Sequence, residues 1–195
     1  VLILPSEVGD FRMRMFNIDG SEGEMCGNAV RCIGKYVYER GMTQKNVITL
    51  ETLGGIKTLQ LHIQNDIVIA VTADMGEPIL EAAQIPVISD KTPVIGEKLQ
   101  ILDKTFDVTC VSMGNPHGVI FVDDTEHFEV EKHGKVAEVH PMFPKKANIE
   151  FAHVIDRTHM SMRVWERGSG ETMACGTGAC ATLVAGVLNG LCDRK

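Results

Sequence analysis

The sequence lacks the features that would place the protein in a membrane, in a secretory pathway or on a nucleic acid. It contains no run of about 18 apolar residues, the length that a helix needs to cross a bilayer. The apolar start, residues 1–5, has neither the basic region nor the full hydrophobic segment of a secretory signal. The net charge is −7 and basic residues are scattered, which argues against a nucleic-acid partner. We therefore expect a globular cytoplasmic protein without a membrane segment.

The six cysteines form no CxxC pair. Because nothing indicates export, we expect them to be reduced. Cys26 and Cys32 are six residues apart and Cys175 and Cys180 five apart, so on helices they would lie about 240° and about 140° from each other. That geometry disfavours zinc, and no metal site is predicted. Four cysteines are expected to be core or neutral positions: Cys32, Cys110, Cys180 and Cys192.

Short strands joined by tight turns dominate the middle of the chain. Residues 47–53, 56–63 and 67–73 predict a meander of antiparallel hairpins, with Asn65 and Asp66 forming the second turn. The residues MGEP at 75–78 break this pattern and predict a boundary between domains at 1–75 and 76–195. Further strands are expected later in the chain, at residues 106–113, 118–122, 149–155 and 160–165.

Two segments are predicted to be helical. Residues 26–40 place apolar side chains on one face at helical spacing and charges on another. Residues 175–189 carry no charge, so this helix is expected to be buried on nearly all sides. An uncharged helix among antiparallel strands suggests a sheet wrapped around a central helix. The fold class predicted is therefore α+β.

An internal repeat relates the two helices. Residues 25–30 (MCGNAV) resemble residues 174–179 (ACGTGA), and a glycine follows each cysteine by 15 residues, at Gly41 and Gly190. Upstream, residues 19–24 parallel residues 167–172 with a shift of one position. Recurrence of loop, helix and terminal glycine predicts two similar halves that arose by duplication.

The repeated cysteines predict a specific kind of chemistry. A cysteine at a helix N-terminus faces unpaired N–H groups and the positive end of the helix dipole, which lower the thiol pKa from about 8.5 toward neutrality. If the two halves face each other, Cys26 and Cys175 flank one cleft. A thiolate on one side and a thiol on the other could then invert a carbon centre by removing a proton from one face and returning one to the other. Each cysteine taken alone is more simply a small buried residue, and the repeated context argues against that interpretation.

Five ordered motifs resemble the diaminopimelate epimerase family, and the resemblance runs over essentially the whole chain. The motifs are FNIDGS at 16–21, EMCGN at 24–28, SMGNPH at 112–117, WERG at 165–168 and ACGTG at 174–178. The related proline racemase and hydroxyproline epimerase group shares the two Cys-Gly motifs but is less similar. Asn28 stands where that group has histidine, and the second motif lacks its Asp-Arg-Ser-Pro lead-in.

The resemblance implies a fold and a reaction. The fold has two pseudo-symmetric α+β domains, each a mostly antiparallel β-sheet or barrel wrapped around a central helix. The reaction is interconversion of LL- and meso-2,6-diaminopimelate, on the route to lysine and peptidoglycan precursors, without pyridoxal phosphate, metal or any other cofactor. The partner implied is a small amino-acid substrate, and a homodimer is left open. The first domain is expected to lack its usual N-terminal segment and the second its last strands.

The resemblance also implies roles for individual residues. Cys26 and Cys175 would be the acid/base pair, with His117 and Glu166 tuning the thiol pKa values. The reacting α-carboxylate would be held by backbone N–H groups at Gly27, Asn28, Gly176 and Thr177. The distal amino-acid end of the substrate would be recognised by Asn17, Asn148, Glu166 and Arg167, with Asn115 a further contact. Two alternatives stay open: a racemase of proline or hydroxyproline, and a non-catalytic relative in which the cysteines are structural.

Overall fold

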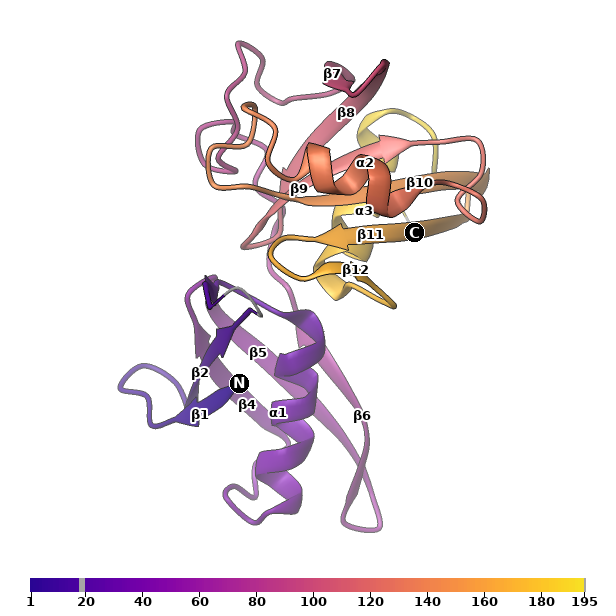
Figure 1. Ribbon diagram of the computed structural model, residues 1–195. Coiled ribbons are helices and arrows are strands. Elements are labelled where there is room, and N and C mark those ends of the chain that lie inside the picture. Colours follow the sequence, from indigo (N-terminus) through magenta and orange to yellow (C-terminus); the bar gives the residue numbers. More distant parts are fainter. Residues whose placement is uncertain (18–19, 195) are drawn as a thin grey trace. The chain divides into compact units, whose positions relative to one another are not determined.

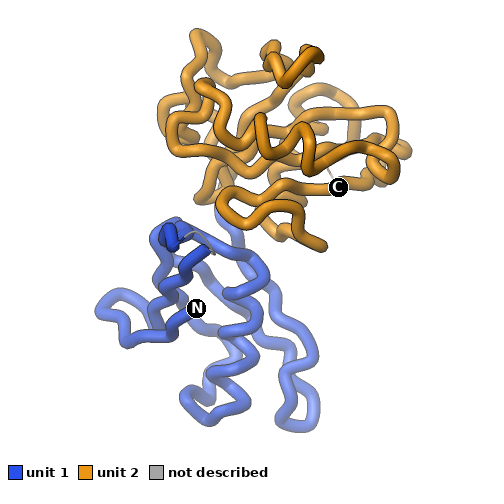
Figure 2. The backbone as a smooth tube through the Cα atoms, viewed as in Figure 1, with its two compact units in different colours: residues 1–76 blue, residues 77–195 orange. Residues whose placement is uncertain are grey.

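A computed structural model describes residues 1–17 and 20–194. The chain divides into two compact units, unit 1 over Val1–Gly76 and unit 2 over Glu77–Lys195 (Figure 2). The division falls inside the MGEP segment that breaks the strand pattern. Each unit has its own hydrophobic core. The core of unit 1 lies between its strands and helix α1, Gly27–Glu39, and that of unit 2 lies between its sheet and helix α2, Val130–Ala137.

Unit 1 is a six-stranded sheet packed against helix α1, Gly27–Glu39 (Figure 1). The strand order is β1-β2-β4-β5-β6, with β3 paired to β2. Strands β2 and β4 pair in parallel and the other pairs are antiparallel. The strands are β1 Leu2–Leu4, β2 Phe11–Phe16, β3 Glu22–Gly23, β4 Val47–Thr52, β5 Gly55–Gln64 and β6 Ile67–Asp74.

The predicted meander of unit 1 is confirmed. Asn65 and Asp66 have φ angles of 51° and 61°, the left-handed conformations of a two-residue turn whose twist matches the flanking strands. Alternation then puts one face of β5 in the core, where Leu59 and Leu61 are almost completely buried. The hairpin β5–β6 therefore follows from local turn chemistry together with the period-two pattern.

Unit 2 contains a second six-stranded sheet, in the order β12-β11-β10-β9-β8-β7. Only β9 and β10 pair in parallel among the strands described for this unit. The strands are β7 Glu97–Ile101, β8 Lys104–Ser112, β9 Pro116–Phe121, β10 Asn148–Asp156, β11 His159–Glu166 and β12 Gly170–Thr172. The four strands predicted in this region from sequence correspond to β8, β9, β10 and β11.

Two helices cover opposite faces of the unit 2 sheet. On β11, Met162 contacts Thr182 of helix α3, Gly176–Leu188, while Trp165 packs against Gly134 of helix α2, Val130–Ala137. Because residues an odd number of positions apart point to opposite faces of a strand, α2 and α3 lie on opposite sides. On β10, Glu150 faces α3 and its neighbour Phe151 lies in the core with Phe128. Glu150 is thereby placed beside the N-terminus of α3.

Helix α2 is an addition to the two helices predicted from sequence. It is short, and no side chain caps its N-terminus at Glu129, so it carries neither of the usual local signals. His133 of this helix is 2% exposed and packs against the rings of Phe106 and Phe128. Its Nδ1 lies 3.0 Å from the backbone oxygen of Glu129, which satisfies the buried ring.

The expectation that α3 is buried on nearly all sides is wrong. Ala181 and Ala185 are buried against the sheet, whereas Ala179 is exposed and Leu183 is 40% exposed. The helix packs against one face of one sheet. Its other side stays exposed although it carries no charge, because the described part of unit 2 places no further element there. No helix in the described part of the chain is long and apolar enough to span a membrane.

The predicted repeat is present in the two helices. Both α1 and α3 have 13 residues and begin directly after a cysteine. Both end at a glycine in the left-handed region, Gly41 with φ 68° and Gly190 with φ 69°. The residue after each glycine donates its N–H to the carbonyl five positions back, Met42 to Val37 and Leu191 to Gly186, each at 2.9 Å. The same cysteine cap and the same glycine stop therefore define both helices.

Candidate active site

Cys26 and Cys175 are the N-caps of α1 and α3. The Cys26 sulfur accepts a hydrogen bond from the backbone N–H of Ala29 at 3.5 Å, and the Cys175 sulfur accepts one from Gly178 at 3.3 Å. Each sulfur thus lies over the first turn of its helix, where N–H groups are unpaired and the helix dipole is positive. Cys26 is half-buried and Cys175 is 8% exposed. All six cysteines are in the described part of the chain and are free thiols.

The surroundings of Cys175 favour the thiol over the thiolate. Burial, followed by the charges of Glu150 and Glu166, raises the pKa of Cys175 to about 12. Hydrogen bonds from the Thr177 hydroxyl and the Gly178 N–H act in the opposite direction. The expectation of a lowered thiol pKa at this helix N-terminus is therefore wrong for Cys175 in this arrangement. Desolvation and two carboxylates outweigh the helix dipole.

The raised pKa predicts how Cys175 reacts in the absence of substrate. Only the thiolate attacks iodoacetamide, so alkylation of Cys175 should be slow at pH 7 and should rise about tenfold per pH unit across the neutral and alkaline range. Peptide mass spectrometry after timed alkylation measures the rate at this site alone. A rate that is already independent of pH near 7 would contradict the assignment of Cys175 as a thiol.

A chain of hydrogen bonds connects Cys175 to the interior of unit 2. The Thr177 hydroxyl oxygen lies 3.3 Å from the Cys175 sulfur and accepts a hydrogen bond from Asn115 Nδ2 at 3.2 Å. Asn115 Oδ1 lies 3.0 Å from His117 Nε2, and His117 Nδ1 lies 2.7 Å from Glu150 Oε1. His117 is in strand β9 and completely buried. The structure therefore brings four predicted site residues into one network: Asn115, His117, Cys175 and Thr177.

Glu150 is a residue of this network that the sequence reasoning missed. Its side chain is completely buried, and its Oε1 makes the contact with His117. The only signal in the sequence is a carboxylate in the middle of an otherwise apolar strand segment, residues 149–152 (IEFA). Buried carboxylates are rare unless they are paired, so an acidic residue at such a position indicates a partner in the folded protein.

A second group of predicted residues is organised by Asn148 and Glu138. Asn148 is 4% exposed; its Oδ1 accepts the Arg167 N–H at 2.9 Å and its Nδ2 donates to the Pro116 carbonyl at 3.0 Å. The Glu138 carboxylate, also missed from sequence, accepts the Gly168 N–H at 3.0 Å and the Trp165 indole N–H at 2.8 Å. These bonds fix the loop that carries Glu166 and Arg167.

The side chains of Glu166 and Arg167 have further contacts within unit 2. Glu166 accepts a hydrogen bond from the Thr172 hydroxyl, and Arg167 donates to the Lys145 carbonyl at 3.3 Å. Thr172 precedes Cys175 by three residues, so Glu166 is tied to the segment that leads into α3. From this position the negative charge of Glu166 raises the pKa of Cys175.

Of the remaining predicted residues, Gly176 is the first residue of α3 and the others belong to unit 1. Asn17 donates its backbone N–H to the Ser21 carbonyl at 2.8 Å and its Nδ2 to the Ser21 hydroxyl at 3.1 Å. Asn28 Oδ1 accepts from Arg31 at 2.6 Å, and Gly27 is buried at the start of α1. Ile18 and Asp19, two residues of the first motif, lie outside the described residues.

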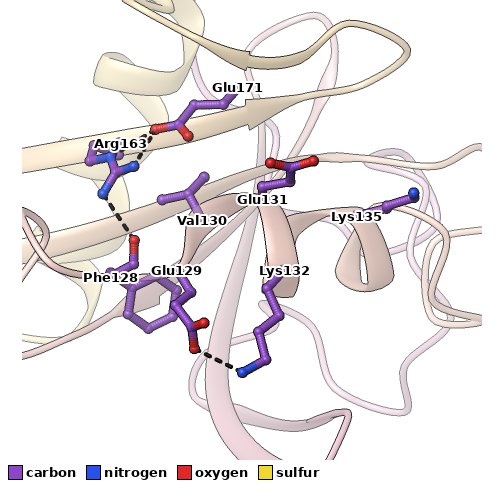
Figure 3. A pocket seen from close by; sticks show the side chains of 8 residues that line it. All are labelled: Phe128, Glu129, Val130, Glu131, Lys132, Lys135, Arg163 and Glu171. Carbon is purple, nitrogen blue, oxygen red and sulfur yellow. Dashed lines mark hydrogen bonds and ion pairs between the residues drawn. The ribbon is translucent and has the colours of Figure 1, made fainter.

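One surface pocket of unit 2 contains none of the predicted site residues (Figure 3). It lies at the start of α2, and its side chains form ion pairs, Arg163 with Glu171 at 2.7 Å and Lys132 with Glu129 at 2.8 Å. Paired surface charges of this kind are ordinary solvent-exposed features. Within the described residues, no group of three or more histidine, cysteine or acidic side chains is placed to hold a metal ion.

Comparison with known proteins decides the family. The family model of diaminopimelate epimerase matches residues 1–81 and 109–195. Proteins with that name cover the whole chain at 62% identity in Acetivibrio thermocellus, 58% in Methanococcus maripaludis strain C6 and 50% in Bacillus cytotoxicus. The chain spans 70% of the length of the first two and 68% of the third. The chain belongs to the diaminopimelate epimerase family.

Membership of the diaminopimelate epimerase family makes the protein an isomerase, an amino-acid epimerase that acts on a small molecule. Solved structures of lower identity share the fold. A hydroxyproline epimerase from Agrobacterium vitis superposes with a TM-score of 0.77 at 15% identity, over 98% of this chain and 60% of that one. A PhzF-family phenazine biosynthesis protein from Bacillus anthracis gives 0.61 at 23% identity, over 95% and 64%. The predicted fold class of two pseudo-symmetric α+β domains is confirmed.

Proposed function

We propose that the protein interconverts LL- and meso-2,6-diaminopimelate by proton transfer between two cysteines, Cys26 and Cys175, in the biosynthesis of lysine and peptidoglycan precursors. The observation that supports this most is the paired N-cap geometry, in which each sulfur accepts a hydrogen bond from the first turn of its helix. Two equivalent acid/base groups are what a carbon inversion needs, one for each face of the reacting carbon. No other group, bound or covalent, takes part in the proposed proton transfer.

The surroundings of Cys175 suggest which cysteine starts in which form. Burial and nearby carboxylates raise the pKa of Cys175, so this residue begins as the proton donor. Cys26 then acts as the thiolate base and removes the α-proton from the other face. In the reverse direction the roles exchange, since each cysteine has taken up the form that the other had. The mechanism requires both sulfurs to reach the same carbon from opposite sides.

Backbone N–H groups stabilise the charge that develops on the substrate carboxylate. Removal of the α-proton turns the carboxylate into an enediolate-like dianion, which is poorly stabilised in water-poor surroundings without donors. Gly27 and Asn28 in α1, and Gly176 and Thr177 in α3, provide N–H groups at helix N-termini. The two glycines permit close approach of the ligand to the backbone.

The distal end of the substrate is recognised by charge and shape. Arg167 can bind the distal carboxylate with two parallel hydrogen bonds, and Glu166 can accept from the distal ammonium group. The amide side chains of Asn17, Asn115 and Asn148 complete the proposed contacts. Asn148 does so from a position already held by two backbone bonds, which limits its freedom before the substrate binds.

Incubation with LL-diaminopimelate in deuterated water tests reaction and substrate together. The two-base mechanism predicts that one solvent deuteron enters the α-position as the meso isomer forms, without any added cofactor. Mass spectrometry with chiral separation of the product measures both. Turnover of proline or 4-hydroxyproline instead, with diaminopimelate left unlabelled, would favour a racemase of the other group. Absence of label from all three would favour a non-catalytic relative.

A further inference from the structure

In each hydrogen bond between Cys175 and Glu150, the chemistry of the side chains determines which atom donates and which accepts. Asn115 donates through Nδ2 to the Thr177 oxygen, so its Oδ1 faces His117 Nε2 at 3.0 Å. An amide oxygen can only accept, and Nε2 must therefore carry a hydrogen. The Thr177 oxygen, having accepted from Asn115, directs its own hydrogen to the Cys175 sulfur 3.3 Å away. With the Gly178 N–H, the sulfur then has two donors.

The donor and acceptor roles in these hydrogen bonds depend on Glu150, the residue furthest from Cys175. His117 Nδ1 lies 2.7 Å from Glu150 Oε1, a contact that needs one hydrogen between the two atoms. Because Nε2 already carries its hydrogen, Glu150 and His117 must hold one further proton, on Nδ1 or on the carboxyl group. Without that partner, the imidazole could carry its single hydrogen on Nδ1. The Asn115 amide would then reverse, and the Thr177 hydroxyl would turn away from the sulfur.

Glu150 has little structural reason to be where it is. Its second oxygen, Oε2, is buried without a hydrogen-bond partner among the described residues, which is unfavourable. Its first oxygen lies where it excludes a side chain from the first turn of α3. A Cβ built on Gly178 would be 2.7 Å from Glu150 Oε1 and 3.3 Å from the Cys175 sulfur. The carboxyl group and the reacting sulfur therefore lie against the same glycine, and a buried oxygen without a hydrogen-bond partner beside a reactive group points to a functional role.

We propose that Glu150 is a positioning residue for Cys175: by sharing a proton with His117, it orients the hydrogen bonds that end on the Cys175 sulfur. The proposal deepens the proposed function and rests on it only in taking Cys175 as the reacting thiol. Cys175 must become a thiolate in one direction of the reaction, and the oriented Thr177 hydroxyl stabilises that form. The titratable groups facing Cys175 are Glu150 on β10, Glu166 on β11 and, through Asn115, His117 on β9.

Glu150→Gln and Glu150→Leu form a matched pair for testing this role. Both remove the carboxylate charge, and only glutamine can donate an amide hydrogen to His117 Nδ1 and so keep the hydrogen on Nε2. At any pH below the thiol pKa, Cys175 in Glu150→Leu should be alkylated by iodoacetamide about tenfold more slowly than in Glu150→Gln, since one hydrogen bond to the thiolate is lost. The rates are measured at this site by peptide mass spectrometry on the full-length protein over a range of pH.

Controls separate the positioning role from general damage. Phe151→Leu alters the neighbouring position of β10, whose side chain lies on the opposite face of the sheet. It should leave the alkylation rate of Cys175 unchanged at every pH. Thr177→Val removes the hydroxyl donor and keeps Glu150 and the Gly178 N–H, so Cys175 should be alkylated about tenfold more slowly than in the unaltered protein. If Glu150→Leu does not fold, an unchanged alkylation rate in Thr177→Val still overturns the proposal, because the Glu150 role acts through the Thr177 hydroxyl. Equal rates in the two Glu150 variants, or an unchanged rate in Thr177→Val, would overturn the proposal. Alkylation needs no turnover, so the result is independent of whether the protein epimerises diaminopimelate.

Discussion

Cys26→Ser and Cys175→Ser are each expected to reduce epimerisation of diaminopimelate by roughly a thousandfold or more. A serine hydroxyl is too weak an acid to provide the base, and a positioned acid or base contributes about 10²–10⁴-fold to such reactions. The helices should remain intact, because serine is a better N-cap than cysteine. Initial rates of interconversion, together with circular dichroism, measure the two effects separately.

Two other cysteines provide matched controls on the same helices. Cys32 lies on α1 and Cys180 on α3, both beyond the first turn, and their replacement by serine should leave turnover within a few-fold of normal. The two site variants should also differ with a fluorinated analogue of the substrate. Elimination of HF needs only one base. For each stereoisomer of the analogue, the variant that keeps the cysteine facing its α-proton should therefore still eliminate HF. Near-normal turnover in either Cys26→Ser or Cys175→Ser would refute the two-base mechanism.

Gly134→Ala is expected to destabilise the protein by about 1–3 kcal/mol, although alanine is the better helix former. A Cβ at position 134 would lie 2.5 Å from Cβ and 2.6 Å from Cγ of Trp165. These atoms are next to the backbone of Trp165, so they can move away only if strand β11 shifts. The terminal atoms of a flexible side chain could move by a rotation about a side-chain bond. Thermal or chemical denaturation of the variant measures the loss.

The same substitution at Gly34, in the middle of α1, is the control for Gly134→Ala. There the nearest atom to a Cβ is a terminal methyl carbon of Leu61 at 3.0 Å, which can turn aside. The gain in helix propensity, about 1 kcal/mol, should then offset most of the strain, and the stability should change little. If both variants lost stability equally, the rigid contact with Trp165 would not be the cause of the effect at Gly134.

The features predicted correctly from sequence are those that depend on local backbone physics. A cysteine followed by glycine at the start of an apolar periodic run, with a glycine 15 positions later, specifies cap, helix and stop within one short segment. Asn65 and Asp66 likewise specify a hairpin by their own left-handed conformations. The repeat could be found for the same reason, since each copy carries its complete set of signals in about 20 residues.

The features that escaped prediction depend on neighbours distant in the chain. Helix α2 lacks a side-chain cap and is held by its contacts with the sheet, and His133 is buried because those contacts enclose it. Nothing near Cys175 in sequence shows that two carboxylates approach its sulfur. Burial and those charges raise its pKa, against the expectation from the helix dipole alone.

The residues near each cysteine are enough to predict that both cysteines begin equivalent helices, because a cap needs only its own helix. The acid/base character of Cys175, in contrast, depends on the packing of distant strands around it. Strands β9 and β10 pair in parallel with Asn148 opposite His117, which brings Glu150 within hydrogen-bond distance of a histidine 33 positions away. Charges and hydrogen bonds act through space at a few ångströms, and the distance along the chain carries no information about them until the sheet has formed.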